Sequence, residues 1–263
     1  MKALIPCGGR GTRMLSLTRG APKELLEIAG VPVLFRVLEE CSRSGVNDVL
    51  IVVSPEKNEI VDRVSPLAGS RGMPKSISFA VQTEPRGLAD AIRFGRDFAS
   101  NLSLAVALPD NLFAGAEEGL RQVIDTHLAT GKNVVAMVEI TAEEASRRGP
   151  TSVYPGRVKG DEFIIDRIPD KGERGKTFDT GGKRSAFTGV GRYVFTPEAF
   201  DVIDEVDRNL PYGSELDDVP VMQSLLASGR LTGRVMSGRF FDVGLVSGYE
   251  EATAEYGGAT EIA

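Results

Sequence analysis

The sequence predicts an α/β fold, with a mainly parallel sheet and helices on both of its faces. Over residues 1–140, short apolar runs typical of strands alternate with stretches of helical periodicity, and this alternation builds parallel sheets. The apolar runs are continuous, as in strands that are buried on both faces. Beyond residue 141 the strands become shorter and irregular. We therefore expect a smaller, mixed β elaboration on a parallel core.

The first 140 residues read as five strands and four helices in alternation. We expect strands at residues 2–6, 48–53, 76–81, 102–108 and 133–140, and helices at residues 33–41, 55–67, 87–99 and 117–129. Ser54 as N-cap and Pro55 at the first helical position predict where the second helix begins. Ligands bind at the carboxyl ends of the strands in such sheets. The loops after Pro6, Val81 and Leu108 are therefore candidate ligand loops.

The rest of the chain predicts a mixture of short elements. We expect antiparallel strands at 151–158 and 162–168 around a Pro155-Gly156 turn, strands at 187–195, 232–236 and 239–241, and helices at 197–206, 217–227 and 246–256. Residues 169–186, rich in Gly and Lys, read as a long loop, and both a lid and a plain surface loop stay open. No repeat or linker interrupts the chain, so we expect one domain over residues 1–263.

Composition excludes several classes of function. The 263 residues are 41% hydrophobic and 26% charged, which is an ordinary globular mixture. The net charge of −6 argues against nucleic acid as the main partner. No apolar run reaches the roughly 18 residues of a membrane span, and no signal-peptide pattern opens the chain. Two cysteines and one histidine make a zinc site or a histidine-dependent hydrolase improbable, and we expect a cytoplasmic protein.

The loop after the first strand has the composition of a phosphate-binding loop. Glycines allow backbone N–H groups to approach an anion, and arginine and lysine supply charge. The residues that suggest this chemistry are Gly8, Gly9, Gly11, Thr12, Arg13 and Lys23. The P-loop and dinucleotide fingerprints do not fit the spacing. An ordinary surface turn is the alternative interpretation.

Polar residues stand at the ends of three other apolar runs. Gln82 follows the third strand, with Gly87 close behind, and an amide beside a glycine can read the edge of a nucleobase. Asp110 and Asp242 each follow an apolar run, and two carboxylates near a phosphate chain could hold Mg²⁺. Asp110 could instead cap the next helix.

Taken together, these residues resemble the sugar-1-phosphate nucleotidylyltransferases over nearly the whole chain. The motif GxGTR followed by PKE stands at residues 9–13 and 22–24. Bacterial UTP–glucose-1-phosphate uridylyltransferases are similar at residues 11–15, 22–24, 57–60, 190–193 and 255–257, whereas residues 109–113 are similar to glucose-1-phosphate thymidylyltransferases. The resemblance implies a Rossmann-like fold of the nucleotide-diphospho-sugar transferase type. Residues 1–140 would bind nucleotide, residues 141–245 would bind sugar phosphate, and residues 246–263 would form a C-terminal helix.

The resemblance also implies roles for individual residues. Arg13, Lys23 and Asp110 would be catalytic, and Asp110 with Asp242 would bind Mg²⁺. Gly8, Gly9, Gly11 and Thr12 would bind the phosphates, and Gln82 and Gly87 the base. Gly149, Asp166, Arg167 and Glu215 would bind the sugar phosphate. The implied reaction transfers a nucleotidyl group from an NTP, with UTP favoured, to a sugar-1-phosphate, with glucose-1-phosphate favoured, in a dimer or tetramer.

The sugar-phosphate region departs from the family pattern. The family has Glu-Lys-Pro where this chain has Asp166-Arg167-Ile168-Pro169, with one extra residue, and Arg148 replaces a tyrosine before Gly149. Arginine and lysine are not equivalent at a tight phosphate site. These changes leave three alternatives open: another base (thymidylyl, cytidylyl or guanylyl transfer), another sugar, or a regulator that binds sugar nucleotides without catalysis.

Overall fold

The computed structural model describes residues 1–9, 11, 14–18, 20–148, 152–153, 157–159, 162–170, 182 and 185–258. Its strands are β1 (Lys2–Cys7), β2 (Glu27–Ile28), β3 (Val31–Pro32), β4 (Asp48–Val53), β5 (Ser76–Val81), β6 (Leu104–Ala107), β7 (Asn111–Ala114), β8 (Asn133–Thr141), β9 (Ser152–Val153), β10 (Arg157–Lys159), β11 (Glu162–Ile164), β12 (Ser185–Phe195), β13 (Leu231–Val235) and β14 (Arg239–Asp242).

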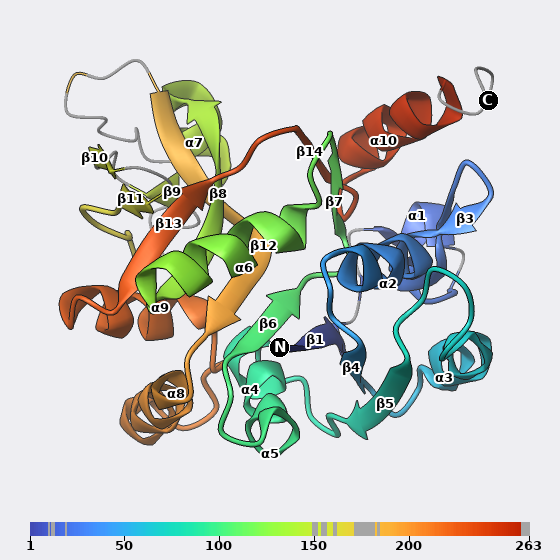
Figure 1. Cartoon of the computed structure of the whole chain (residues 1–263), viewed down its shortest axis with the longest axis horizontal. Coiled ribbons are helices and arrows are strands. Elements are labelled where there is room, and N and C mark those ends of the chain that lie inside the picture. Colours follow the sequence, from blue (N-terminus) through green and yellow to red (C-terminus); the bar gives the residue numbers. More distant parts are fainter. Residues whose placement is uncertain are drawn as a thin grey trace.

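One large sheet of ten strands has the order β10-β11-β13-β8-β12-β6-β1-β4-β5, and β9 pairs with β12 (Figure 1). The half formed by β6, β1, β4 and β5 is parallel, as the alternation of strands and helices predicts. Strand β12 enters antiparallel between β6 and β8, and β13 pairs parallel with β8. The expected α/β fold with a mixed elaboration is confirmed.

Helices pack on both faces of this sheet (Figure 1). They are α1 (Leu15–Thr18), α2 (Val33–Arg43), α3 (Asn58–Val64), α4 (Leu88–Arg93), α5 (Gly95–Ala99), α6 (Gly119–Thr130), α7 (Ala142–Arg148), α8 (Glu198–Asn209), α9 (Asp218–Ala227) and α10 (Val246–Gly258), with 3₁₀ turns at Lys23–Leu25 and Ser65–Leu67. None of the described helices has the length and apolar content to cross a membrane.

Side chains of β1 alternate between two hydrophobic cores. Ile5 belongs to the core beneath α2, α3 and α6, whereas Leu4 belongs to the core beneath α4, α8 and α9. Each core therefore covers one face of the sheet, as expected for strands that are buried on both sides. The last helix, α10, packs with Ala252 buried, and its Tyr249 hydroxyl donates to the carbonyl of Glu27 at 2.7 Å.

Two local expectations were wrong, and some short elements were not expected. The second helix begins at Asn58 rather than Pro55, because Lys57 turns inward to bind two carbonyls and its own N–H closes a turn onto Ser54. The expected helix 87–99 is two helices, α4 and α5. Gly95, the first residue of α5, packs so tightly on Leu104 that a Cβ would lie 2.2 Å from the Leu104 side chain. Strand β7 and helix α7 were not expected.

The expectations for residues 151–186 are only partly visible. Strands β10 and β11 pair antiparallel, as expected, although β11 ends at Ile164 rather than at residue 168. Strand β9 pairs with β12 rather than with its sequence neighbours. The expected turn at Pro155-Gly156 and most of the loop at 169–186 lie outside the described residues.

Candidate active site

The carboxyl ends of β1, β5 and β6 open onto one cleft of about 410 Å³. The residues that line this cleft are Pro6, Gly8, Gly9, Lys23, Glu24, Gln82, Pro85, Gly87, Leu88, Ala91, Leu108, Pro109, Asp110 and Glu215. They come from all three loops that the sequence singled out, together with one segment near residue 215. The fold therefore gathers most of the described candidate residues around a single cavity.

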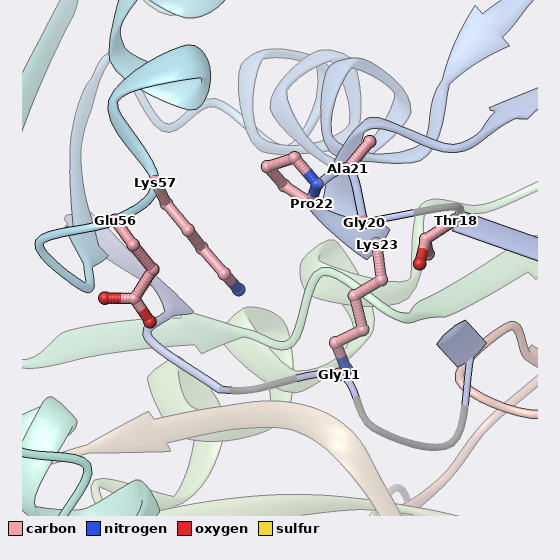
Figure 2. Close-up of a pocket in the computed structure, with 8 residues that line it drawn as sticks. All are labelled: Gly11, Thr18, Gly20, Ala21, Pro22, Lys23, Glu56 and Lys57. Carbon is pink, nitrogen blue, oxygen red and sulfur yellow. The ribbon is translucent and has the colours of Figure 1, made fainter.

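The loop after β1 forms the floor of the cleft. Gly8 lies so close to Gln82 that a Cβ would stand 2.6 Å from its amide oxygen, so a larger residue at this position would displace the buried Gln82 amide. Gly11 has φ +65° and packs against the aliphatic stem of Lys23. A small cavity of about 160 Å³ beside this loop is bordered by Gly11, Lys23 and Lys57, among others (Figure 2). Two further candidates of this loop, Thr12 and Arg13, lie outside the described residues.

A buried lysine fixes the same loop from below. The ammonium of Lys57 donates to the carbonyls of Cys7 at 2.7 Å and of Gly9 at 2.6 Å. It also forms an ion pair with both carboxylate oxygens of Glu24, at 2.9 and 3.0 Å. Lysine has three N–H donors, so one cation links the loop to the residue that follows Lys23. Burial, with Glu24 as the next cause, raises the pKa of the Cys7 thiol well above its usual range.

Lys23 reaches across the cleft to the end of β6. Its ammonium lies 2.5 Å from Oδ2 of Asp110, and both side chains are largely buried. Lys23 opens a 3₁₀ turn, Lys23–Leu25, that follows Pro22. This charge-assisted contact holds the cation in the cleft, at the residue that follows the Leu108-Pro109 turn after β6. The prediction from the sequence placed these two residues in one site, and the structure brings them into contact.

The two strand-end aspartates converge on Gly244. A Cβ at Gly244 would lie 2.9 Å from Oδ2 of Asp110 and 3.1 Å from Oδ1 of Asp242. They are brought together by β7 and β14, which pair antiparallel with Asp242 opposite Asn111. The N–H of Val243 also donates to the carbonyl of Asp110 at 2.9 Å. The hypothesis that Asp110 caps a helix is wrong, because a strand follows it.

This convergence fits a magnesium ion better than a metal held by protein alone. Mg²⁺ is commonly bound by one or two carboxylates plus phosphate oxygens of the substrate. Among the described residues, no group of three or more His, Cys, Asp or Glu side chains is arranged to hold a metal. Asp110 and Asp242 place two carboxylates beside Gly244, where no side chain fills the space. They supply the type and number of ligand atoms that such an ion takes from a protein.

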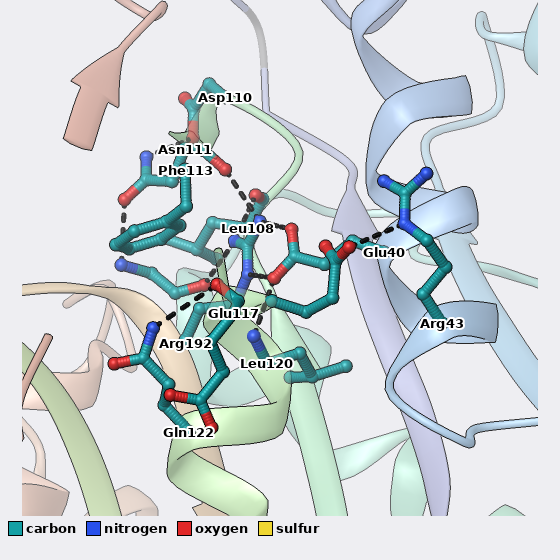
Figure 3. Close-up of polar contacts among 12 residues, drawn as sticks. Glu40, Arg43, Leu108, Asp110, Asn111, Phe113, Glu117, Leu120, Gln122 and Arg192 are labelled. Carbon is teal, nitrogen blue, oxygen red and sulfur yellow. Dashed lines mark hydrogen bonds and ion pairs between the residues drawn. The ribbon is translucent and has the colours of Figure 1, made fainter. Parts of the chain in front are cut away.

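A second buried ion pair lies beneath Asp110 (Figure 3). Arg192, which is 0% exposed, binds both carboxylate oxygens of Glu40 at 2.8 and 2.6 Å. Its remaining donors bind the carbonyls of Leu108, Gly191 and Asn111 at 2.7–3.0 Å. Burial alone would lower the pKa of Arg192, but the ion pair with Glu40 outweighs burial and raises it. All five guanidinium donors are thus used to fix the turn that carries Asp110.

Asn111 connects this network to the site. Its amide nitrogen donates to Oδ1 of Asp110 at 3.0 Å, and its amide oxygen accepts from the N–H of Gly191 at 2.7 Å. The Asp110 carboxylate is therefore held on one oxygen by Lys23 and on the other by Asn111.

The far end of the cleft carries Gln82, Gly87 and Glu215. Gly87 has φ +117°, a conformation that favours glycine. A Cβ there would also lie 2.4 Å from the carbonyl oxygen of Leu216, so both the backbone conformation and the lack of space exclude a side chain. The N–H of Leu216 donates to the carbonyl of Arg86 at 2.5 Å, and its carbonyl accepts from Ala89. These bonds hold the exposed Glu215 at the rim of the cleft.

Two of the four candidate sugar-phosphate residues, Asp166 and Arg167, lie outside the cleft. Asp166 and Arg167 have exposed side chains and are not among the described residues that line the cleft. The buried Ile165 and Ile168 flank them and fix the segment to the second core. Gly149 lies outside the described residues. The structure therefore brings Glu215 to the nucleotide cleft, but not Asp166 or Arg167.

Sequence reasoning missed the buried polar residues that support the site. Arg192 interrupts an apolar strand, and a charged residue in such a strand requires a buried partner. The sequence could therefore have indicated that Arg192 forms a buried ion pair. Its partner Glu40 lies 152 positions away and gives no local signal. The support given by Lys57 depends on contacts between segments that are distant in the chain, which local sequence does not encode.

Comparison with known proteins agrees with this geometry. The family described as "Nucleotidyl transferase" matches residues 2–258. A Bacillus subtilis (strain 168) protein, named provisionally as a UTP–glucose-1-phosphate uridylyltransferase, is 31% identical over 272 residues, covering 94% of this chain and 93% of the relative. The UTP–glucose-1-phosphate uridylyltransferase of Staphylococcus epidermidis (strain RP62A) is 27% identical, covering 97% and 91%. A crystal structure of UDP-glucose pyrophosphorylase complexed with UDP-glucose superposes with a TM-score of 0.81, at 25% identity, covering 98% of both chains.

Proposed function

The chain belongs to the nucleotidyl transferase family, as a sugar-1-phosphate nucleotidylyltransferase, and we propose that it transfers a uridylyl group from UTP to glucose-1-phosphate. An oxygen of the sugar phosphate attacks the α-phosphorus of UTP, the bond from that phosphorus to the β-phosphate oxygen breaks, and pyrophosphate leaves. The names of the relatives support this choice of substrates. The observation that carries the proposal is the contact between Lys23 and Asp110 in the cleft that also contains Gln82.

Each end of the cleft has a separate task in this proposal. Gln82 and Gly87 receive the base, and the N–H groups after β1 receive the phosphates, together with Thr12 and Arg13. Lys23 stabilises the negative charge that moves through the α-phosphate, because a positioned cation in a dry cleft acts where charge develops. Asp110 and Asn111 keep that cation in place before the substrates arrive.

Asp110 and Asp242 would hold Mg²⁺, and the ion, when bound, neutralises charge on the substrate phosphates. Their convergence over Gly244 supports this assignment. Glu215 at the rim of the cleft receives sugar hydroxyls. Asp166, Arg167 and Gly149 receive the sugar phosphate in this proposal. For Arg167, the support is the match in sequence position, because its side chain does not line the cleft.

The test is pyrophosphate release with UTP, glucose-1-phosphate and Mg²⁺, by wild type and by the variants Lys23→Ala and Asp110→Asn. Loss of one preorganised electrostatic contact costs about 10²–10³ in turnover, so each variant should fall by that order. Lys75→Ala serves as the control, because Lys75 is exposed and lies outside the cleft.

Thermal unfolding of each variant shows whether the fold survives the substitution. If folded Lys23→Ala and Asp110→Asn both keep turnover within about threefold of wild type, the assignment of this cleft as the active site is wrong. Release of pyrophosphate by wild type with no sugar phosphate at all would also contradict sugar-1-phosphate as the acceptor.

A further inference from the structure

We propose that Asp90 is a positioning residue that turns the amide oxygen of Gln82 toward the cleft, so that the cleft selects bases with hydrogen on the ring nitrogen. Uracil and thymine carry N3–H, and guanine carries N1–H, whereas the corresponding nitrogens of cytosine and adenine are unprotonated acceptors. This inference rests on the proposed function and concerns which nucleotide the same cleft accepts.

The first step is the contact between Gln82 and Asp90. Gln82 is 5% exposed and follows the last residue of β5. Its amide nitrogen lies 2.7 Å from Oδ2 of Asp90, and 3.4 Å from the carbonyl oxygen of Gly87. A carboxylate and a carbonyl only accept hydrogen bonds, so both neighbours require the NH₂ group of the amide on this side. The Gln82 amide therefore has one favoured orientation.

The second step is the set of contacts that hold Asp90. Its other oxygen, Oδ1, lies 2.6 Å from the guanidinium of Arg93, and Arg86 is 3.7 Å away. Both arginines also bind Asp207 of α8, at 2.8 and 2.6 Å. Two guanidinium groups thus connect the Asp90 carboxylate to a helix outside the cleft. A flipped Gln82 amide would place its oxygen against this carboxylate, two acceptors facing each other at hydrogen-bond distance.

The third step is where the amide oxygen lies. Oε1 of Gln82 would be only 2.6 Å from a Cβ on Gly8, so the oxygen lies directly over the backbone of Gly8. Gly8 and Gln82 both line the cleft, whereas Asp90 does not. None of the described residues donates a hydrogen bond to this oxygen. The amide therefore offers the cleft an acceptor, and its donor group is used behind the cleft.

The chemical consequence is a choice between bases of nearly equal shape. Uracil and cytosine differ at N3 and at the 4-substituent, so a fixed acceptor pairs with N3–H of uracil and faces a lone pair in cytosine. A site built to accept a hydrogen bond rejects an analogue that cannot donate it, because a buried polar group is then left unpaired. We expect wild type to favour UTP over CTP in kcat/KM by at least about tenfold to a hundredfold.

The experiment compares kcat/KM for UTP and CTP in wild type, Asp90→Asn and Asp207→Asn. Asparagine at position 90 can face Gln82 with either its oxygen or its nitrogen, so the amide can turn and the UTP/CTP ratio should fall about tenfold. Asp207→Asn is the matched control, because it removes a carboxylate from the same two arginines without contacting Gln82. Its ratio should stay within about twofold of wild type. Because a general loosening of the cleft would lower activity with both nucleotides, the ratio isolates the orientation of the amide.

Several outcomes decide the inference. A wild type that prefers CTP or ATP overturns it without any variant, even if Asp90→Asn does not fold. An unchanged ratio in folded Asp90→Asn also overturns it. A preference for GTP keeps the role of Asp90 and contradicts uridylyl transfer. If no NTP releases pyrophosphate, the proposed function fails, and calorimetric binding of UTP against CTP to wild type and Asp90→Asn still tests the orientation of the amide.

Discussion

Two buried ion pairs lie beneath the cleft, and they hold different parts of the site. Lys57 and Glu24 lie under the loop after β1, whereas Arg192 and Glu40 lie under the turn after β6. Both pairs are nearly inaccessible to water, and both cations also bind main-chain carbonyls. Buried carbonyls without hydrogen-bond partners would destabilise these irregular segments. The charged side chain therefore supplies the hydrogen bonds that a neighbouring strand supplies inside a sheet.

The two pairs differ in how close they lie to the reacting groups. Lys57 binds the loop itself and the residue next to Lys23, and it borders the small cavity beside that loop. Arg192 binds the framework of β6, β7 and β12 and borders neither that cavity nor the cleft. From this difference we infer that the Arg192–Glu40 pair mainly maintains the fold, while the Lys57–Glu24 pair mainly maintains the shape of the phosphate loop.

The largest effect is expected for Arg192→Met. This change leaves the Glu40 carboxylate buried without its cation, and breaking a buried pair in this way costs about 3–5 kcal/mol of unfolding free energy. Urea unfolding of wild type and variant measures the loss. The free energy of unfolding should fall by that amount even without substrate.

The double variant Glu40→Gln/Arg192→Met is the control for this prediction. It removes both charges, so the penalty of an unpaired buried carboxylate disappears and part of the stability should return. If the double variant is less stable than Arg192→Met alone, the ion pair is not the reason for the loss.

A smaller and different effect is expected for Lys57→Met. The loop loses its links to Cys7 and Gly9, and displacement of reacting groups by about 1 Å can cost up to about 10²-fold in rate. Turnover at saturating UTP and sugar phosphate should fall about 10- to 100-fold. Glu24→Gln/Lys57→Met leaves no buried carboxylate without its cation, and it should show the same fall with the fold intact at the assay temperature. Lys75→Met makes the same change of charge as Lys57→Met at an exposed site and should leave turnover unchanged. Equal turnover in Lys57→Met and Lys75→Met would mean that Lys57 does not position the loop.

The comparison of the two pairs also shows what the sequence could predict. The apolar runs predicted the parallel strands, and the rule that ligands bind at strand ends predicted that Lys23, Gln82 and Asp110 share one cleft. Both predictions depend on patterns that are local in the chain, together with a general rule of topology. The proposed roles of these residues still await the experiments above.

The supporting contacts could not be predicted in the same way. The partners in each ion pair are 33 and 152 positions apart, and their pairing depends on the exact packing of loops against helices. Strand β7 was missed because its four residues gain their partner only from β14, more than a hundred positions later. The position of Asp242 beside Asp110 followed from the resemblance, and its physical cause is this small sheet.

The smallest expected effect is a change in how fast the two cysteines of the chain are labelled. The two labelling rates distinguish local opening of the loop from unfolding of the whole domain. Cys7 ends β1, and its carbonyl oxygen accepts a hydrogen bond from the ammonium of Lys57, while Cys41 follows Glu40 in α2. Burial raises the pKa of Cys7 well above its usual range and that of Cys41 to about 12, so neither thiol should react with iodoacetamide in the native protein at pH 8.

If Lys57 holds only the loop, Glu24→Gln/Lys57→Met should speed the labelling of Cys7 by about tenfold and leave Cys41 unchanged. This double variant removes the links to the loop without leaving an unpaired buried charge, so only the local opening becomes easier. If Arg192 holds the framework, Arg192→Met should speed the labelling of both thiols, since each then reacts through opening of the whole domain. Mass spectrometry of peptides after timed labelling measures both rates in one sample. Equal acceleration of both thiols in Glu24→Gln/Lys57→Met would contradict the division of roles, because a contact that restrained only the loop could not expose Cys41, which lies within α2.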